Sequence, residues 1–309
     1  MKSIAIVVAA GLVAVSVAGV SAEDSTTDQS ASILVFPKVI ADGTQPAPPT
    51  TTDDVVLLVR NSLRVGSNVR QVSGQVVVND PGANAKINRA FRALPGTQLV
   101  AERILITRVP VVAGPQFNDL FVNDFTDPAG TSIFLSQGPL PVTLPLFSPF
   151  PSPATVVPGT QAVMVIGPTP VTLAAGDYGD IRIRGRGALY FEGGTYNVKS
   201  IRGGLNSRVY FNGPTTLNVA ERISLGKRSV FGPPSESVLS GRCIVVNVAS
   251  DRPLQFGGTS NVTATINAPD AFLRLGGLGE YRGNFVAARA KVGRSSVLEA
   301  APPLSGPCL

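Results

Sequence analysis

The sequence contains no histidine. This absence excludes Ser-His-Asp and Cys-His catalysis, histidine metal sites and acid–base work by imidazole. Charged residues are also sparse, at 15% of the chain. No cluster of the remaining acids and bases forms a coherent catalytic set, so we expect no catalytic residue, no metal site and no cofactor.

Cysteine is nearly absent as well. Cys243 and Cys308 are the only two, and they form neither a CxxC motif nor a metal-type spacing. In an oxidising compartment they would form one disulfide that fixes the C-terminal tail to the body of the protein. Two unpaired thiols are the alternative.

The abundant residues favour β structure. The chain has 32 glycines and 26 prolines, a composition that can also indicate disorder. Hydrophobic residues make up 44% of the chain, enough for apolar burial to offset chain entropy, so we expect a folded protein. Without Lys2 there are 25 basic residues (26 − 1) against 20 acidic ones, which permits contact with anionic surfaces but does not demand it.

The N-terminus has the pattern of a signal peptide, predicted over residues 1–22. Lys2 precedes an uncharged apolar run, and small residues near Ala22 offer a cleavage site. A membrane anchor is the alternative, although the run is barely long enough to span a bilayer. We therefore expect a secreted protein, extracellular, on the cell surface or in the periplasm.

Three stretches of the chain match themselves after a shift of about one rung of a coil. A shift of 22 aligns six pairs of like residues: Arg64 with Lys86, Val65 with Ile87, Val69 with Phe91, Arg70 with Arg92, Gly74 with Gly96, and Val78 with Val100. At a shift of 20, residues 189–193 align with 209–213, followed by Asn197-Val198 with Asn218-Val219 and Ile201 with Ile223. A shift of 19 aligns five pairs: Val262 with Tyr281, Ile266 with Phe285, Ala268 with Ala287, Ala271 with Ala290, and Leu273 with Val292.

Within each repeat the apolar residues alternate, as in strands, and glycine-rich corners separate the strands. Leu189 and Phe191 would face inward while Tyr190 and Glu192 face outward. The predicted fold is therefore all-β, a single-stranded parallel β-helix with about three strands in each rung of 19–22 residues. A β-sandwich is the main alternative, but it would not be expected to show these offsets with matched glycines.

The expected organisation follows from where the repeats occur. Residues 23–54 would be a linker with a capping strand at Ile33–Phe36, and residues 55–109 the first rungs. Residues 110–160 would be an irregular, Pro-rich insertion with a short helix at Phe117–Phe125. The main β-helix would cover 161–300, and 301–309 would be a tail.

The second half resembles a poorly characterised group of secreted bacterial parallel β-helix proteins. The resemblance rests on residues 176–183, 193–196, 231–233 and 266–276, and the stretch 281–285 is loosely similar to bactofilins, which polymerise through β-helices. The resemblance implies fold and export, and implies little about activity. Bactofilins are typically cytosolic, so their filament role transfers only weakly.

Basic residues supply the main candidate binding site. Arg186, Arg208 and Arg228 each precede the second strand of a rung and would form a vertical ladder, with Tyr190 and Tyr210 beside them to stack on sugar rings. This pattern favours an anionic polysaccharide or cell-surface polymer as ligand. A solvated, solubilising corner is the plainer interpretation.

Other candidate sites are weaker. Asp177 and Asp180, with Glu192, could form a carboxylate pair for glycoside cleavage, but residues of this type are common in turns. Asp119, Asp124 and Asp127 could hold calcium, although they fit no EF-hand pattern. Threonines at positions 259, 263 and 265 do not recur at rung spacing, which argues against ice binding.

The leading functional hypothesis is a non-catalytic, secreted or cell-surface structural protein. The open ends of a β-helix can pair with another copy, so self-assembly into an oligomer or homopolymer is part of this hypothesis. An anionic-polysaccharide binder is the alternative, and a carbohydrate-active enzyme is the third. No specific nucleic acid partner and no integral membrane segment are expected.

Overall fold

The computed structural model describes residues 55–88, 90–107, 116–127, 133–138, 152, 154–302 and 308, together with the strand backbone of 7–9 and 12–14. The chain divides into two units, residues 1–38 and 39–309. In the first unit, β1 (Val7–Ala9) pairs antiparallel with β2 (Leu12–Ala14). The proposed signal-peptide cleavage site and the capping strand at Ile33–Phe36 lie outside the described residues.

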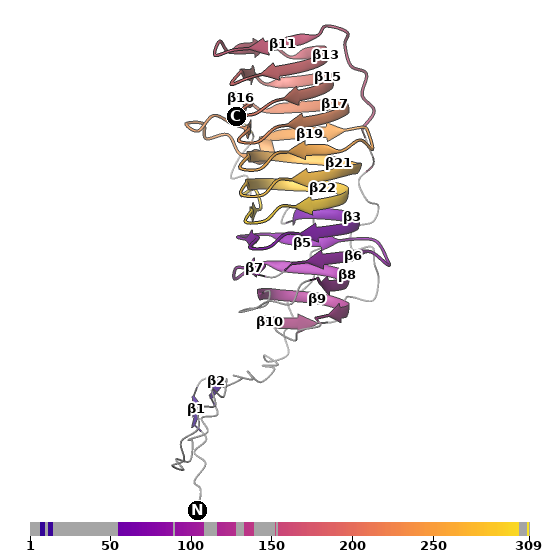
Figure 1. Ribbon diagram of the computed structural model, residues 1–309, viewed down its shortest axis with the longest axis vertical. Coiled ribbons are helices and arrows are strands. Elements are labelled where there is room, and N and C mark those ends of the chain that lie inside the picture. Colours follow the sequence, from indigo (N-terminus) through magenta and orange to yellow (C-terminus); the bar gives the residue numbers. More distant parts are fainter. Residues whose placement is uncertain are drawn as a thin grey trace, which may run out of the picture. The chain divides into compact units, whose positions relative to one another are not determined.

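The second unit is a parallel β-solenoid of about 10 turns (Figure 1). Its N-terminal strands are β3 (Val55–Val65), β4 (Arg70–Gln71), β5 (Gln75–Val78), β6 (Asn84–Ile87), β7 (Arg92–Ala93), β8 (Gln98–Ile106), β9 (Gln116–Thr126) and β10 (Ile133–Gly138). Its C-terminal strands are β11 (Val163–Ile166), β12 (Val171–Leu173), β13 (Gly176–Arg184), β14 (Ala188–Phe191), β15 (Gly194–Gly203), β16 (Arg208–Phe211), β17 (Thr215–Leu225), β18 (Val230–Gly232), β19 (Ile244–Val248), β20 (Leu254–Phe256), β21 (Asn261–Leu275), β22 (Glu280–Val292) and β23 (Val297–Glu299). A short 3-10 helix, η1 (Gly241–Cys243), precedes β19.

Each turn presents three faces, here numbered in chain order. In the turn of β13 and β14, face 1 carries Gly176–Tyr178, face 2 carries Asp180–Arg184, and face 3 carries Ala188–Phe191. Inward side chains are buried, and alternate ones point outward, because successive strand residues face opposite ways. Aromatic rings fill the core in successive turns, with the Phe191 and Phe211 centroids 5.2 Å apart.

The register confirms the predicted stacking. Leu189 pairs with Val209, and Val65 pairs with Ile87. Three of the predicted alignments drift, because the turns differ in length. Val100 pairs with Val77 rather than Val78. Ala290 pairs with Leu273 rather than Ala271, and Val292 with Leu275 rather than Leu273, both after a register shift in β21 that follows Ala268.

The turns are not stacked in sequence order. β22 pairs in parallel with β3, so the last full turn of the chain lies directly on the first (Figure 1). From this junction the N-terminal strands continue to β10, and the C-terminal strands continue the other way to β11. Residues 139–162 therefore connect strands at opposite ends of the strand order, which explains why the repeats are interrupted there.

The helix predicted at Phe117–Phe125 is wrong. This segment lies in β9, which pairs with β8 in the same parallel register as the other turns. Leu120 and Val122 are buried at strand spacing. The i, i+3, i+4 pattern of phenylalanines and leucine misled the prediction because residues on either face of a strand can be apolar. β9 and β10 thus add turns inside the segment expected to be irregular.

A column of glycines forms the corner between faces 2 and 3. Its members are Gly204, Gly226, Gly257, Gly276, Gly293 and Gly66, linked from turn to turn by backbone hydrogen bonds. A Cβ on Gly276 would lie 2.3 Å from the carbonyl carbon of Gly257, so only glycine permits this stacking distance. Buried serines complete the corner; for example, Ser229 Oγ donates to the Gly226 carbonyl at 2.8 Å.

Candidate functional site: a column of cations on face 2

The predicted Arg186–Arg208–Arg228 ladder does not form. Arg208 pairs with Ala188 in one neighbouring turn and with Val230 in the other. Arg186 and Arg228 lie two residues earlier, in the glycine corner, and Arg228 has a positive φ of 58°. The sequence pattern does not fix the register, which places Arg208 one outward position further along than the other two. All three side chains are exposed.

The two predicted tyrosines do lie together. Tyr190 and Tyr210 are register partners on face 3, with ring centroids 5.0 Å apart. The next residue in this column is Gly232, so the aromatic pair does not continue. The described structure brings the tyrosines to the face that also carries Arg208, and separates them by the glycine corner from face 2.

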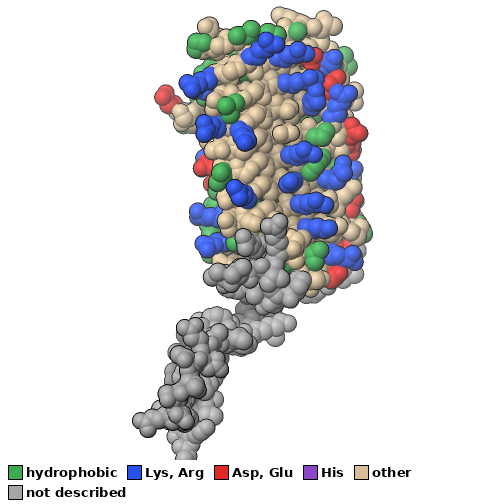
Figure 2. All heavy atoms as spheres, viewed as in Figure 1, with side chains coloured by type: hydrophobic (Ala, Val, Ile, Leu, Met, Phe, Trp, Pro, Cys, Tyr) green, Lys and Arg blue, Asp and Glu red, His purple; other side chains and the backbone are tan. Residues whose placement is uncertain are grey.

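Face 2 carries a longer column of cations that the sequence analysis missed. Continuous register pairs link its outward residues in the order Arg182, Arg202, Ser224, Gln255, Arg274, Lys291, Arg64 and Lys86. Adjacent strands lie about 4.8 Å apart, so Arg274 to Lys86 form four cations in consecutive turns. Figure 2 shows Lys and Arg side chains in rows on the side of the stack in view, with Asp and Glu mainly along its edges.

The column has little neutralising charge around it. Among the described residues, none of its six cations lies within ion-pair distance of a carboxylate. The two flanking outward columns of face 2 contain Arg103, Arg184, Arg222 and Arg289 against Asp124 and Asp180. Asp124 accepts a hydrogen bond from Arg103 at 2.8 Å, so its charge is already compensated.

Two features shape the surface beside the column. On one side the next outward positions are the corner glycines, so bare backbone rather than side chains borders most of the cations. On the other side Phe272 lies under two guanidinium groups, with Arg274 4.8 Å and Arg289 5.5 Å from its ring centroid. These cation–π contacts hold the two arginines near the ring.

The candidate catalytic carboxylates serve cross-turn hydrogen bonds. Asn197 Nδ2 donates to Asp177 Oδ1 at 2.7 Å, and Ser200 Oγ donates to Asp180 Oδ1 at 2.6 Å. The hydrogen bond from Ser200 lowers the pKa of Asp180, with nearby Lys199 and arginines acting in the same direction. A carboxyl group with a lowered pKa is poorly suited to act as a general acid.

Asp177 ends a ladder of amides on face 1. The side-chain Nδ2 of each asparagine in the ladder donates to the side-chain oxygen at the same position of the preceding turn, at 2.7–3.1 Å. The donors, in order, are Asn197, Asn218, Asn247 and Asn267. The ladder satisfies these side chains within the protein and stiffens the stack. Of these steps, only the stacking of Asn197 on Asn218 was visible in the sequence.

The calcium hypothesis finds no support in the part of the chain that the structure describes. Asp124 pairs with Arg103, Asp127 already has an interaction partner, and the side chain of Asp119 lies outside the described residues. Among the described residues no three metal-ligating side chains gather.

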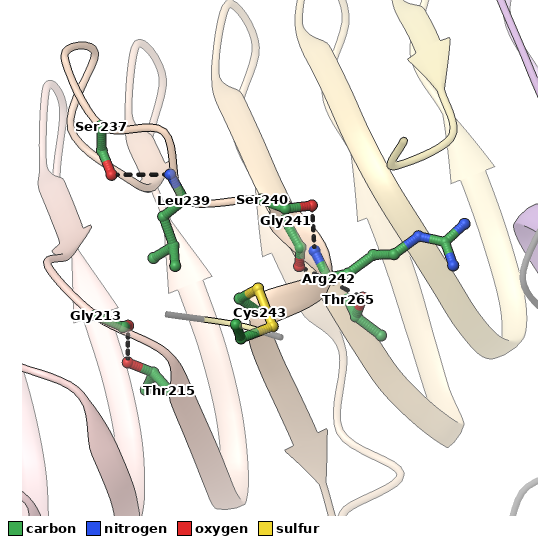
Figure 3. Close-up of a disulfide and its surroundings, with 10 residues drawn as sticks. Gly213, Thr215, Ser237, Leu239, Ser240, Gly241, Arg242, Cys243 and Thr265 are labelled. Carbon is green, nitrogen blue, oxygen red and sulfur yellow. Dashed lines mark hydrogen bonds between the residues drawn. A yellow bond between two sulfur atoms is a disulfide. The ribbon is translucent and has the colours of Figure 1, made fainter. Parts of the chain in front are cut away.

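The disulfide is confirmed. Cys243 and Cys308 are bonded, with a Cα–Cα distance of 5.5 Å, beside the start of β19 (Figure 3). Arg242 Nη2 donates to the Ala301 carbonyl at 3.1 Å, giving the tail a second attachment. Both contacts lie beside face 1, next to Thr216 and Val245.

One pair of threonines stacks in adjacent turns on face 1, Thr195 on Thr216. The same outward column continues through Val245 to Thr265. Thr265 itself has Val245 and Asn284 as register partners, so it does not recur at rung spacing. Cys308 lies beside the first members of this column and η1 beside Thr265, so the column is not an open flat array.

The fold and these surfaces define a parallel β-solenoid protein. No family model matches the chain, and no curated protein matches it. Among solved structures, it is similar to an ice-binding protein from an Antarctic bacterium of the Flavobacteriaceae, at 8% identity and a TM-score of 0.30, covering 82% of this chain and 98% of that one. Within the described residues, no helix is long and apolar enough to cross a membrane.

Proposed function

We propose that this chain is a non-catalytic, secreted structural protein whose copies associate end to end. The observation that carries the proposal is that residues 128–176 contain no Asp, Glu, Lys or Arg. This stretch includes β10 and β11, the strands at the two ends of the stack. Solenoids usually need polar terminal repeats for solubility, and edge strands are usually protected by charge.

The β11 end carries exposed apolar side chains. Met164 is 48% exposed, Ile166 is 60% exposed, and Val157 in the same turn is 77% exposed. Among the described strands, β11 pairs only with β13, which leaves its other edge available. All strands of the stack run parallel, so a second copy added at this edge in the same orientation would continue the sheet. Such head-to-tail contacts do not close and produce filaments.

The proposal that the protein is non-catalytic is supported by the absence of a coherent set of catalytic residues. The chain has no histidine, and the two candidate carboxylates, Asp177 and Asp180, are engaged in cross-turn hydrogen bonds. The Cys243–Cys308 disulfide supports export, because disulfides persist in oxidising compartments.

The test places charge on the β11 edge. Met164→Lys with Ile166→Lys should abolish concentration-dependent growth of the sedimentation coefficient and of filaments seen by electron microscopy. The matched control is Leu205→Lys with Leu278→Lys, two side chains of similar exposure (53% and 61%) at corners away from the β11 edge. The control should assemble like the unmodified protein. A protein that stays monomeric at all concentrations would refute the proposal.

A further inference from the structure

We propose that face 2 binds an anionic polysaccharide chain laid along the stack, with the cation column from Arg182 to Lys86 as the site. The inference does not depend on end-to-end association, since every contact lies within one copy. It places polyanion binding on a different face from the arginines and tyrosines that the sequence indicated.

The column is assembled only by folding. Arg274 and Lys291 come from β21 and β22, whereas Arg64 and Lys86 come from β3 and β6. The β22–β3 junction joins the two pairs into one uninterrupted row. Two arginines, Arg182 and Arg202, extend the same column beyond Ser224 and Gln255.

Such a row carries an electrostatic cost without a partner. Like charges directly opposite each other on neighbouring strands destabilise a sheet. Elsewhere on this solenoid, cations meet carboxylates; for example, Arg282 contacts both Glu280 and Glu299. Among the described residues no carboxylate lies within ion-pair distance of the face 2 column, where Asp180 acts only at longer range on Arg182 and Arg202. A linear polyanion would supply direct contacts at every turn.

The geometry favours a polysaccharide over a nucleic acid. The cations form a straight row at even spacing, which suits an extended chain with one acidic group per sugar or per disaccharide. Single-stranded nucleic acids are held chiefly by bases stacking on exposed aromatic rings. The one aromatic ring in the described part of this face beside the column, Phe272, is already covered by Arg274 and Arg289. The glycine corner leaves room for sugar rings beside the charges.

The binding test uses the full-length mature chain with immobilised dextran sulfate and polygalacturonate, which carry sulfate and carboxylate respectively. Neutral dextran and single-stranded DNA are compared at the same concentration. The column variant is Arg64→Ser, Arg274→Ser and Lys291→Ser. It should bind at least one of the acidic polysaccharides about tenfold or more weakly. The slope of log K against log salt should fall by about one for each cation removed.

The matched control removes three exposed cations outside face 2, none of which is the register partner of another: Arg186→Ser, Arg208→Ser and Arg228→Asn. Asn is used at position 228 because it tolerates the positive φ there. The control should lose less than about threefold, and both variants should keep the unmodified melting temperature within a few degrees. Both are charge-matched, so any difference reports the position of the cations.

Three outcomes would overturn the proposal. The first is that the unmodified protein binds neither polyanionic polysaccharide. The second is an equal loss in the column variant and the control, which would show attraction by net charge alone. The third is tighter binding to single-stranded DNA than to either polysaccharide. None of these outcomes bears on end-to-end assembly, which the β11 edge variants test separately.

Discussion

Tyr281 donates its hydroxyl to the carbonyl of Gly276 at 2.7 Å, within the glycine corner. Gly279 occupies the corner position that serine takes in several other turns, and a Cβ there would lie 2.6 Å from the tyrosine hydroxyl. Ser296 of the next turn donates to the same carbonyl at 2.9 Å. One partly buried acceptor is therefore shared by two hydroxyls from neighbouring turns.

This sharing predicts a non-additive double-mutant cycle. Tyr281→Phe and Ser296→Ala should each cost about 1 kcal/mol of unfolding free energy, because each leaves the carbonyl one donor. The double variant should cost about 1–2 kcal/mol more than the sum, since the partly buried carbonyl then has no side-chain donor. Denaturant unfolding measures all three values. Strict additivity would show that the two hydroxyls act independently.

The glycine corner predicts that equivalent substitutions differ sharply in effect. In Gly276→Ala the new Cβ meets backbone of the preceding turn at 2.3 Å, so we expect a loss of about 3 kcal/mol or more. Gly204 occupies the same corner two turns from the β11 end of the stack. In Gly204→Ala no atom of another turn lies within 4 Å of the new Cβ. That control should be neutral or slightly stabilising. Equal losses in thermal unfolding would mean that the turns are not packed as described.

Sequence periodicity predicted the fold because equal-length turns preserve their register. The shifts of 22 and 20 residues placed Val65 over Ile87 and Leu189 over Val209, as the structure has them. The same method failed where turn lengths vary. Asn218 and Asn247 are register partners, yet the loop before β19 separates them by more than a standard turn.

The binding site was harder to predict because it depends on which turns are neighbours. Lys291 and Arg64 are adjacent only through the β22–β3 pairing, which joins segments far apart in sequence. A shift analysis compares each turn with the next one along the chain, so it could not place them together. The ladder that it did predict fails because Arg208 lies in a different column from Arg186 and Arg228.

The disulfide should contribute substantially to stability. Cys243 and Cys308 close a loop of sequence separation 65, for which chain-entropy models give about 4 kcal/mol. Cys243→Ser with Cys308→Ser should lower the melting temperature, and a reductant should lower that of the unmodified protein similarly. The reductant should have no effect on the double variant. A reductant effect in that variant would point to some cause other than this bond.

Two buried tyrosines, Tyr196 and Tyr281, should make the stability of the fold depend on pH in the alkaline range. Burial raises the pKa of Tyr196 and of Tyr281, chiefly by removing the phenol from water. Their folded pKa values lie above the unfolded value of about 10, so the stability they contribute is fully present below that pH. It is lost as pH rises through the raised values. Ultraviolet absorbance should show tyrosinate from these two residues only as the fold is lost.

Single variants show which tyrosines ionise only on alkaline unfolding, here called the late step. The absorbance change of this step should be smaller by the contribution of one tyrosine in Tyr196→Phe, and likewise in Tyr281→Phe. An undiminished late step in the Tyr281 variant would contradict its burial.

The order of the turns predicts that the chain can be permuted into a continuous solenoid. After β23 the chain would naturally continue to the turn that stacks on β22, and that turn is β3. Joining Ala300 directly to Val55 leaves four residues, 299, 300, 55 and 56, between the inward side chains of Leu298 and Leu57. One turn earlier, three residues (282–284) separate the inward Tyr281 and Phe285.

The permuted chain would run from residue 152 to 300 and then from 55 to 138, with Cys243→Ser because Cys308 is lost. Its control is the native-order chain carrying Cys243→Ser and Cys308→Ser. The permuted chain should show the same β-type circular dichroism and a melting temperature within several degrees of the control, because every described strand pairing of the solenoid is retained. It should also refold faster, since the β22–β3 contact becomes local in sequence. A permuted chain that fails to fold while the control folds would show that β22 and β3 are not neighbours in the stack.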